Sequence, residues 1–232
     1  MAKNLTQTFD PAKPPAHVHQ SSIVVPEPES IMPYPVVKLM QALSPELDDS
    51  DSKFISDASQ GDIVVTDGAS STVIDGQEGF KFAPVLVRKV WNEWIPRKQG
   101  GGFVASYNSR EEMEVGFTAG NEIVISIDYL IATNELSNDK ELDLLLLQFN
   151  SATKMARARE MAGSISKYKT MEGVTYHLTS MAQKNKAGQK FYNFMISPVG
   201  WTAKPILDQL KDLQVEAGQK FLPEPDDKVP PF

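Results

Sequence analysis

Residues 80–108 constrain the fold of this chain more than any other stretch. They begin with a long run rich in valine, isoleucine and aromatic residues, which are typical of β-strands. Pro96 ends regular pairing because it has no backbone N–H to donate, and the glycines at 100–102 supply a turn. Residues 103–107 again have strand composition. The sequence therefore predicts a bent β-hairpin.

Alternation along the first strand divides its side chains between two faces. The even-numbered face contains Leu86, Arg88, Val90, Asn92 and Trp94. The odd-numbered face contains Val85, Val87, Lys89, Trp91, Glu93 and Ile95. The hairpin thus presents aromatic, basic and polar side chains together.

A second hairpin is predicted over residues 174–197. Its two strands, 174–183 and 189–197, flank a segment with lysines and a glycine that favours a turn. The expected tip is basic, and the strands beside it hold several aromatic residues, among them Tyr192.

The remaining segments complete a mainly β chain. Further strands are predicted near 61–68, 123–133 and 142–149, and loops near 45–51, 69–79 and 111–120. Ser151 can cap a helix to about residue 168, and Thr202 can cap another that Gly218 terminates. About six strands, with one helix between the fourth and fifth, resemble the OB barrel. The expected fold class is mainly β with two helices (α+β): a small OB-fold-like barrel with an N-terminal arm and a C-terminal tail.

Three parts are expected along the chain. Residues 1–58 form a proline-rich and acidic arm, 59–218 an OB-like nucleic-acid-binding domain, and 219–232 a flexible acidic tail. The arm is expected to pack on a second subunit, which makes the protein a homodimer. Its His17 and His19 lack a third ligand, so no metal site is expected.

Composition excludes several classes of protein. No run approaches the roughly 18 apolar residues of a membrane span, and the N-terminus lacks the apolar segment of a signal peptide. The chain contains no cysteine, which removes disulfides and thiolate catalysis. We expect a cytoplasmic protein, in the host cell if the source is a virus.

No catalytic motif is recognisable. Walker A, GxGxxG, HExxH and Gly-x-Ser-x-Gly sequences are all missing. His177 lies in a predicted strand and is expected to be a hydrogen-bonded structural residue. We expect a protein that is not an enzyme and needs no cofactor, with a nuclease that uses scattered carboxylates as an alternative.

The charge is unevenly distributed. The net charge of −7 disfavours binding to nucleic acid at first sight. Residues 1–80 hold twelve acidic side chains against four basic ones, whereas residues 154–190 hold eight basic against two acidic. A polyanion can therefore bind the basic zone, while a solvated face of mixed charge is the alternative.

The two hairpins supply the residue types that unpaired nucleotides require. Aromatic rings stack on bases and cations meet phosphates. The predicted stacking residues are Trp91, Trp94, Tyr107 and Tyr192, and the predicted phosphate contacts are Arg88, Lys89, Arg97, Lys98, Lys184, Lys186 and Lys190. The alternative is that Trp91 or Trp94 simply fills the core.

The last residues point to a partner. Acidic residues and prolines keep this end solvated, and Phe232 places a carboxylate beside its own ring, a combination that a basic pocket can bind. The tail resembles the C-terminal tip of bacterial single-stranded DNA-binding proteins at Asp226, Asp227, Val229, Pro231 and Phe232, and departs from it at Lys228 and Pro230. The resemblance implies that Asp226, Asp227 and Phe232 recruit replication proteins.

The general architecture is similar to that of single-stranded DNA-binding proteins of tailed bacteriophages. That similarity implies largely sequence-independent binding of single-stranded DNA in phage replication, recombination and repair. A structural or assembly protein of the virion is the first alternative, and a nuclease or annealing factor is another.

Overall fold

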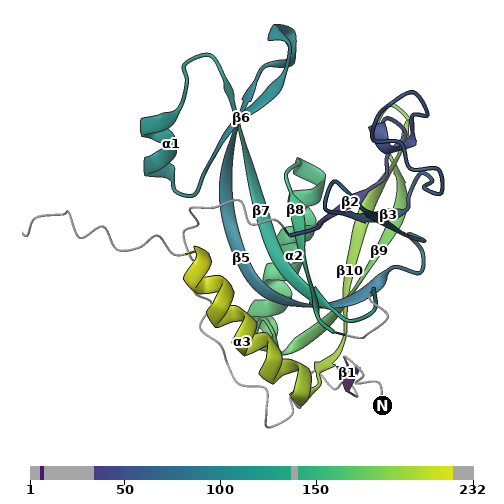
Figure 1. Ribbon diagram of the computed structural model, residues 1–232, viewed down its shortest axis with the longest axis vertical. Coiled ribbons are helices and arrows are strands. Elements are labelled where there is room, and N and C mark those ends of the chain that lie inside the picture. The colour runs from purple at the N-terminus through teal and green to yellow at the C-terminus, as the bar shows by residue number, and fades with distance from the viewer. Residues whose placement is uncertain (1–5, 8–33, 137–140, 222–232) are drawn as a thin grey trace, which may run out of the picture.

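The structure is a computed structural model that describes residues 6–7, 34–136 and 141–221. Ten strands form one strongly curled sheet, in the order β1-β10-β9-β5-β7-β8-β2-β3-β4 with β6 paired to β5 (Figure 1). The strands are β1 (Thr6–Gln7), β2 (Val36–Leu39), β3 (Ile63–Thr66), β4 (Ser71–Ile74), β5 (Phe80–Ile95), β6 (Gly102–Tyr107), β7 (Glu122–Thr133), β8 (Asp143–Phe149), β9 (Val174–Lys184) and β10 (Lys190–Thr202). The helices are α1 (Arg110–Gly116), α2 (Ala152–Tyr168) and α3 (Lys204–Phe221), with short 3-10 turns η1 (Pro45–Leu47) and η2 (Arg97–Gln99).

Strand β5 connects the two halves of the sheet. Its first three residues pair with β9, and from Ala83 onward it pairs with β7. The register shifts at a bulge between Pro84 and Leu86, and Pro84 has no backbone N–H to donate to a neighbouring strand. Bulges bend the strand that contains them, so β5 turns the sheet back on itself into a half-barrel (Figure 1).

The connectivity of the five long strands is consistent with an OB-fold-like barrel. Strand β5 pairs with both β7 and β9, β7 pairs with β8, and β9 pairs with β10. Helix α2 lies between β8 and β9 along the chain. The protein is therefore mainly β and OB-fold-like, as the sequence predicts for the fold class, with three helices where two were expected.

Two apolar layers cover opposite faces of the curled sheet. One layer contains Tyr129 and Ile131 of β7 with Met161 and Ile165 of α2. The other contains the alternate β7 residues, Leu130 and Ala132, with residues of α3. Because neighbouring residues of β7 enter different layers, α2 packs on one face and α3 on the other.

A side chain bridges the seam that the strands leave open. The backbone amide of Tyr192 in β10 donates to the side-chain oxygen of Gln41, and the Gln41 amide donates to the Tyr192 carbonyl, both at 3.0 Å. Gln41 follows β2, so one glutamine takes the place of a strand residue beside β10.

The Gln41 bridge should contribute measurably to stability. We expect Gln41→Ala to lower the free energy of unfolding by about 1–3 kcal/mol, because two hydrogen bonds are lost. Gln41→Glu should also destabilise, since a carboxylate accepts from the Tyr192 amide but cannot donate to its carbonyl. Urea unfolding followed by circular dichroism measures both variants. Unfolding midpoints equal to that of the unchanged protein would show that the bridge is dispensable.

Most predicted elements are confirmed, including both hairpins, the strands at 61–68, 123–133 and 142–149, and the helix capped by Ser151. Helix α1 occupies a predicted loop, where Ser109 and Glu112 form a capping box that the sequence already contains. Strand β4 occupies another predicted loop, and pairs with β3.

Two boundaries also differ from the prediction. Strand β2, in the region expected to be an arm, pairs with β3 and β8 inside the sheet. Helix α3 continues past Gly218 to Phe221, because packing of its apolar side on the sheet outweighs the low helix propensity of one glycine. In the described parts of the chain, no helix is long and apolar enough to span a membrane.

Candidate nucleic-acid interface

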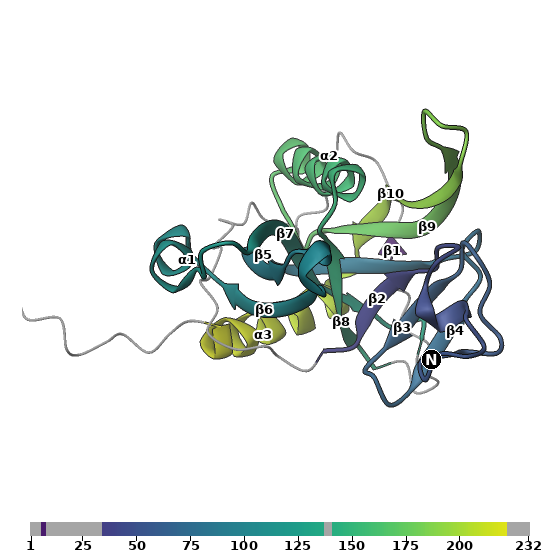
Figure 2. The ribbon, with the colours of Figure 1, turned by 90° about the horizontal axis from the view of Figure 1, so that it is seen from above.

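Two elements that carry the predicted contacts project from the barrel. The first is the β5–β6 arm, formed by residues 90–107 together with residues 122–126 of β7. The second is the β9–β10 tip, residues 183–190. Both extend toward the same end of the molecule (Figure 1), and the view from above shows that they are separate projections (Figure 2).

The odd-numbered face of the arm presents Trp91. Its neighbours across the strands are Tyr107 of β6 and Ile125 of β7. The Lys89 Nζ lies 4.4 Å from the centroid of the Trp91 ring, a favourable contact between a cation and an aromatic face. Ile125 is 39% exposed, so this apolar surface reaches solvent.

The even-numbered face of the arm presents a second aromatic pair. Trp94 lies opposite Phe103, and their rings meet edge to face with centroids 5.4 Å apart. Trp94 is 39% exposed and Phe103 48% exposed. Neither Trp91 nor Trp94 is enclosed in the core, and the two rings lie on opposite faces of the arm.

Arg88 forms an ion pair with a buried carboxylate. Its Nε lies 3.3 Å from the carboxylate of Asp128, which is buried and also accepts from Gln148 and Ser126. The Arg88 side chain is only 17% exposed. A buried carboxylate needs a compensating charge, so the structure uses Arg88 mainly to hold Asp128.

Tyr107 is fastened to a buried carboxylate. Its hydroxyl donates to Glu93 at 2.5 Å, and Glu93 also accepts from the Thr118 amide at 3.0 Å and from the Asn121 side chain. The hydrogen bond from Tyr107, with those from Asn121 and Thr118, lowers the pKa of Glu93 although burial opposes the change. The same bond raises the pKa of Tyr107. Glu93 therefore ties β6 to the turn that leads into β7.

Gly116 approaches the same ring closely. A Cβ at this position would lie 2.6 Å from Cε1 of Tyr107, so only glycine lets the end of α1 pack on the tyrosine. Because its hydroxyl donates to Glu93 and the end of α1 packs on its ring, Tyr107 stabilises the contact between the arm and α1.

The hydrogen bonds of the Glu93 carboxylate should weaken in acid. Because the pKa of Glu93 is lowered in the folded protein, its stabilising effect is complete above the ordinary value of 4.5 and is lost as pH falls through the lowered pKa. We expect the protection factors for amide hydrogen exchange at Thr118 and Asn121 to fall over that range. In Tyr107→Phe the largest cause of the lowered pKa is removed, so the fall in protection should begin at higher pH. An identical pH profile in the two proteins would contradict this account.

The β9–β10 tip concentrates positive charge. Lys184 and Lys190 lie directly opposite each other in the ladder, and Lys186 lies in the turn between them. All three are exposed, and in the described parts of the chain none pairs with a carboxylate. Like charges opposite each other in a sheet are unfavourable, so an anion bound at this tip would relieve repulsion.

Asn185 shapes the turn at the tip. Its side-chain oxygen accepts from the amides of Ala187 and Gln189, and its amide donates to the Gln189 side chain. These bonds hold the two lysine-bearing strands in register. On β10, the Lys190 Nζ lies 4.8 Å from the Tyr192 ring, which itself packs against the apolar layer that contains Tyr129 and Met161, and over Gly61.

Comparison with known protein families identifies the group to which this barrel belongs. The family model described as Pam3 phage gp34-like protein matches residues 29–220. The chain belongs to the Pam3 phage gp34-like family. It is thus a member of a bacteriophage family, and the matched stretch includes both the β5–β6 arm and the β9–β10 tip. No curated protein and no solved structure matches it.

The basic zone of this family member divides between two elements. The tip holds three of its lysines, and α2 holds others. Arg157 of α2 pairs with Glu160 at 2.6 Å, and Lys154 lies with its Nζ 5.9 Å from the centroid of the Phe194 ring. Burial lowers the pKa of Lys154. Lys154 and Arg157 are therefore less available to a polyanion than the lysines of the tip, whereas Arg159 and Lys167 of α2 are exposed.

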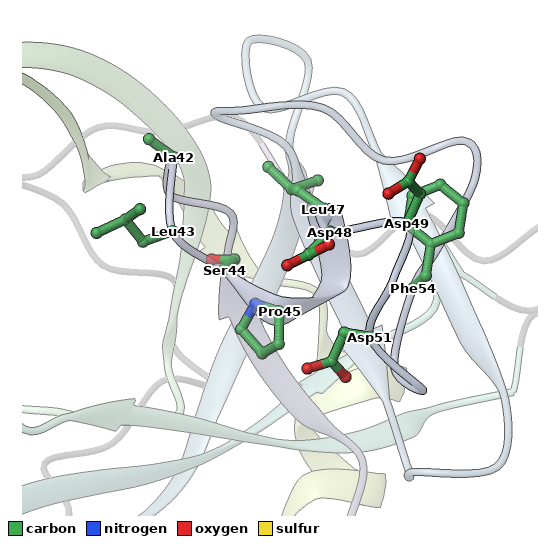
Figure 3. Close-up of a pocket in the computed structure, with 9 residues that line it drawn as sticks. All are labelled: Ala42, Leu43, Ser44, Pro45, Leu47, Asp48, Asp49, Asp51 and Phe54. Atoms are coloured by element: carbon green, nitrogen blue, oxygen red, sulfur yellow. The ribbon is translucent and has the colours of Figure 1, made fainter.

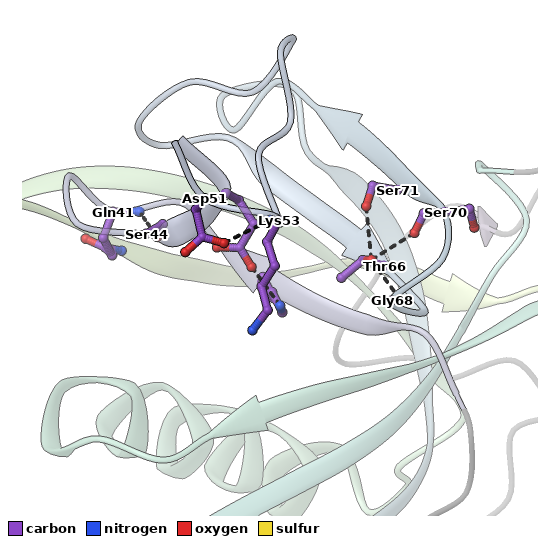
Figure 4. Close-up of polar contacts among 10 residues, drawn as sticks. Gln41, Ser44, Asp51, Lys53, Thr66, Gly68, Ser70 and Ser71 are labelled. Carbon is purple, nitrogen blue, oxygen red and sulfur yellow. Dashed lines mark hydrogen bonds and ion pairs between the residues drawn. The ribbon is translucent and has the colours of Figure 1, made fainter. Parts of the chain in front are cut away.

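The acidic loop after β2 forms a shallow pocket. It is lined by Ala42, Leu43, Ser44, Pro45, Leu47, Asp48, Asp49, Asp51 and Phe54 (Figure 3). The carboxylate of Asp51 accepts from the backbone amide of Lys53 (Figure 4), and that of Asp48 accepts from the backbone amide of Ser50. These contacts are turns of the loop itself, and the described residues contain no group of three or more side chains placed to hold a metal.

Sequence reasoning missed two residues of the arm surface. Phe103 adds an exposed ring beside Trp94, and Ile125 extends the surface beside Trp91. Phe103 could have been found as an aromatic residue that follows a glycine turn, whereas the position of Ile125 depends on strand pairing. His177 is a structural residue whose Nε2 lies 2.7 Å from the Glu78 carbonyl.

Several predicted sites lie outside the described residues. They are the proposed partner contacts Asp226, Asp227 and Phe232; His17 and His19, where no metal site is expected, also lie outside these residues.

Proposed function

We propose that this phage protein binds single-stranded DNA without strong sequence preference and without catalysing a reaction. The observation that carries the proposal is the location of exposed aromatic and basic side chains on two particular connections of the barrel. The β5–β6 arm joins the first and second long strands, and the β9–β10 tip joins the fourth and fifth. In OB folds these two connections and the sheet between them bind oligonucleotides.

The aromatic groups suit unpaired bases. Trp94 and Phe103 are more than a third exposed, and Trp91 is partly exposed beside Lys89. Stacking on a base contributes on the order of 1–3 kcal/mol per ring and accepts any base, because every base has a flat face. Tyr107 and Tyr192 are held by neighbouring groups, so we assign them supporting roles beside the stacking rings.

The charge distribution suits a phosphate backbone. Exposed cations lie at the projecting ends: Lys89, Arg97, Lys98, Lys184, Lys186 and Lys190. Acidic side chains are concentrated in the loop after β2, and others lie beside the arm in α1 and at Glu122. Local potential, more than net charge, determines where a polyanion binds. We omit Arg88 from the phosphate contacts because it compensates Asp128.

The partner and cellular role enter the proposal from sequence. We propose that the tail residues Asp226, Asp227 and Phe232 recruit replication proteins, and that the protein acts in phage replication, recombination and repair in the host cytoplasm. A homodimer remains our expectation for its assembly.

Tryptophan fluorescence should report binding. Titration with oligo-dT at low salt should quench the emission, since stacking of a base on an exposed indole changes its surroundings. Duplex DNA of the same length should bind more weakly, because its bases are already stacked. If saturating single strands at low salt change neither the emission nor the electrophoretic mobility of the protein, the proposal fails.

The lysines of the tip should determine part of the salt dependence. We expect removal of Lys184 and Lys190 in a double alanine variant to weaken binding about tenfold and to reduce the slope of log K against log salt by roughly 1.4, at about 0.7 per phosphate contact. A matched variant removes two exposed lysines of α3, Lys204 and Lys211, and changes net charge equally. Fluorescence anisotropy at several salt concentrations measures both variants. Equal losses in the two variants would show that only net charge matters.

A further inference from the structure

The two tryptophans of the arm cannot belong to one flat stacking surface. They are three residues apart on β5, and the pairing with β7 is continuous from Trp91 opposite Ile125 to Trp94 opposite Glu122. No residue is inserted into β5 that would bring both rings to the same side. Alternation therefore sends Trp91 through one face of the arm and Trp94 through the other.

Each face has its own complement of binding groups. On the odd-numbered face, Trp91 lies between Tyr107 and Ile125, with the Lys89 ammonium 4.4 Å from its ring centroid. The carboxylate of Glu93, which shares this face, is buried and occupied by hydrogen bonds. An unpaired base and a phosphate can thus approach this face without meeting that negative charge.

On the even-numbered face, Trp94 and Phe103 offer two rings set edge to face. Arg97 and Lys98 follow directly in η2. Glu122 lies across the ladder from Trp94 on the β7 side, and it is exposed. A phosphate backbone on this face is therefore favoured along β6, away from Glu122.

We propose that the arm contains two separate sites for unpaired nucleobases, one on each face, so that one chain holds two DNA segments at once. The inference rests on the proposed function and adds an activity to it. Two strands held on opposite sides of one arm are kept at high effective concentration, which favours the annealing of complementary strands. Among the described residues β6 pairs only with β5, so β6 is an edge strand. A single long DNA strand can therefore also pass around this edge and reach both faces of the arm.

Short oligonucleotides separate two sites from one. We expect the full-length protein to bind about two molecules of oligo-dT of about eight nucleotides, a length within the range for OB folds. A mixture labelled with donor and acceptor dyes should then show energy transfer that depends on protein. Trp91→Ala and Trp94→Ala should each bind about one oligonucleotide per chain, and each should lower the energy transfer and the annealing rate of complementary strands. Phe54→Ala, which removes an exposed ring of the acidic loop, should behave as the unchanged protein.

Two further variants test each face at an exposed position, where a substitution is not expected to disturb folding. Ile125→Glu and Phe103→Glu place a carboxylate at exposed positions on the odd-numbered and even-numbered faces respectively. Each should abolish one site and leave the other, with an unchanged circular dichroism spectrum.

The possible results have distinct meanings. Loss of all binding in either single-face variant, or only one oligonucleotide bound by the unchanged protein, would overturn the two-site inference while the proposed function stands. Two oligonucleotides still bound per chain by Trp94→Ala would also overturn it, because the second site would then not depend on that ring. Failure of the unchanged protein to bind any single strand would overturn the proposed function as well.

Discussion

The double pairing of β5 is the constraint on which the rest of the structure depends. A strand that joins β9 at its start and β7 over most of its length must bend, and the bulge near Pro84 provides the bend. Without it the two halves of the sheet would not curl around the apolar layer that contains Tyr129 and Met161, and α2 and α3 would lose the opposite faces on which they pack. The same strand then runs beyond the core and becomes the centre of the β5–β6 arm.

The arm is stabilised by polar contacts where the apolar layers end. Asp128 with Arg88, and Glu93 with Tyr107, are buried carboxylates whose hydrogen bonds join neighbouring strands. Partly satisfied buried carboxylates would be costly, whereas these have several donors each. This arrangement leaves the aromatic and basic side chains at the surface free of a structural task, which is a precondition for binding a ligand there.

Charge is segregated in a protein that is acidic as a whole. The loop after β2 carries exposed carboxylates, while the β9–β10 tip opposes two lysines across a ladder. Repulsion between those lysines reduces the stability of the hairpin. A loss of hairpin stability at an exposed tip does not help the protein fold, whereas the same paired lysines favour the binding of an anion.

Local patterns in the amino-acid sequence are enough to predict most short-range elements and the face assigned to each side chain of the first hairpin. Glycine turns, Pro96 and strict alternation are local properties, and they predicted the hairpins and the opposite locations of Trp91 and Trp94. The α2 cap was predicted from Ser151, which is also a local signal. Local signals also existed for α1, in the capping box of Ser109 and Glu112, and were outweighed by its acidic composition.

Contacts between distant strands, in contrast, set which of these side chains are available to a ligand. Arg88 and Tyr107 have the right chemistry for DNA, yet strand pairing sets Arg88 beside Asp128 and Tyr107 above Glu93. Ile125 joins the surface for the same reason, because its neighbour comes from a strand more than thirty residues away. Alternation assigns a side chain to a face, but the partner it meets there depends on register between distant strands, which no local pattern in this sequence specifies.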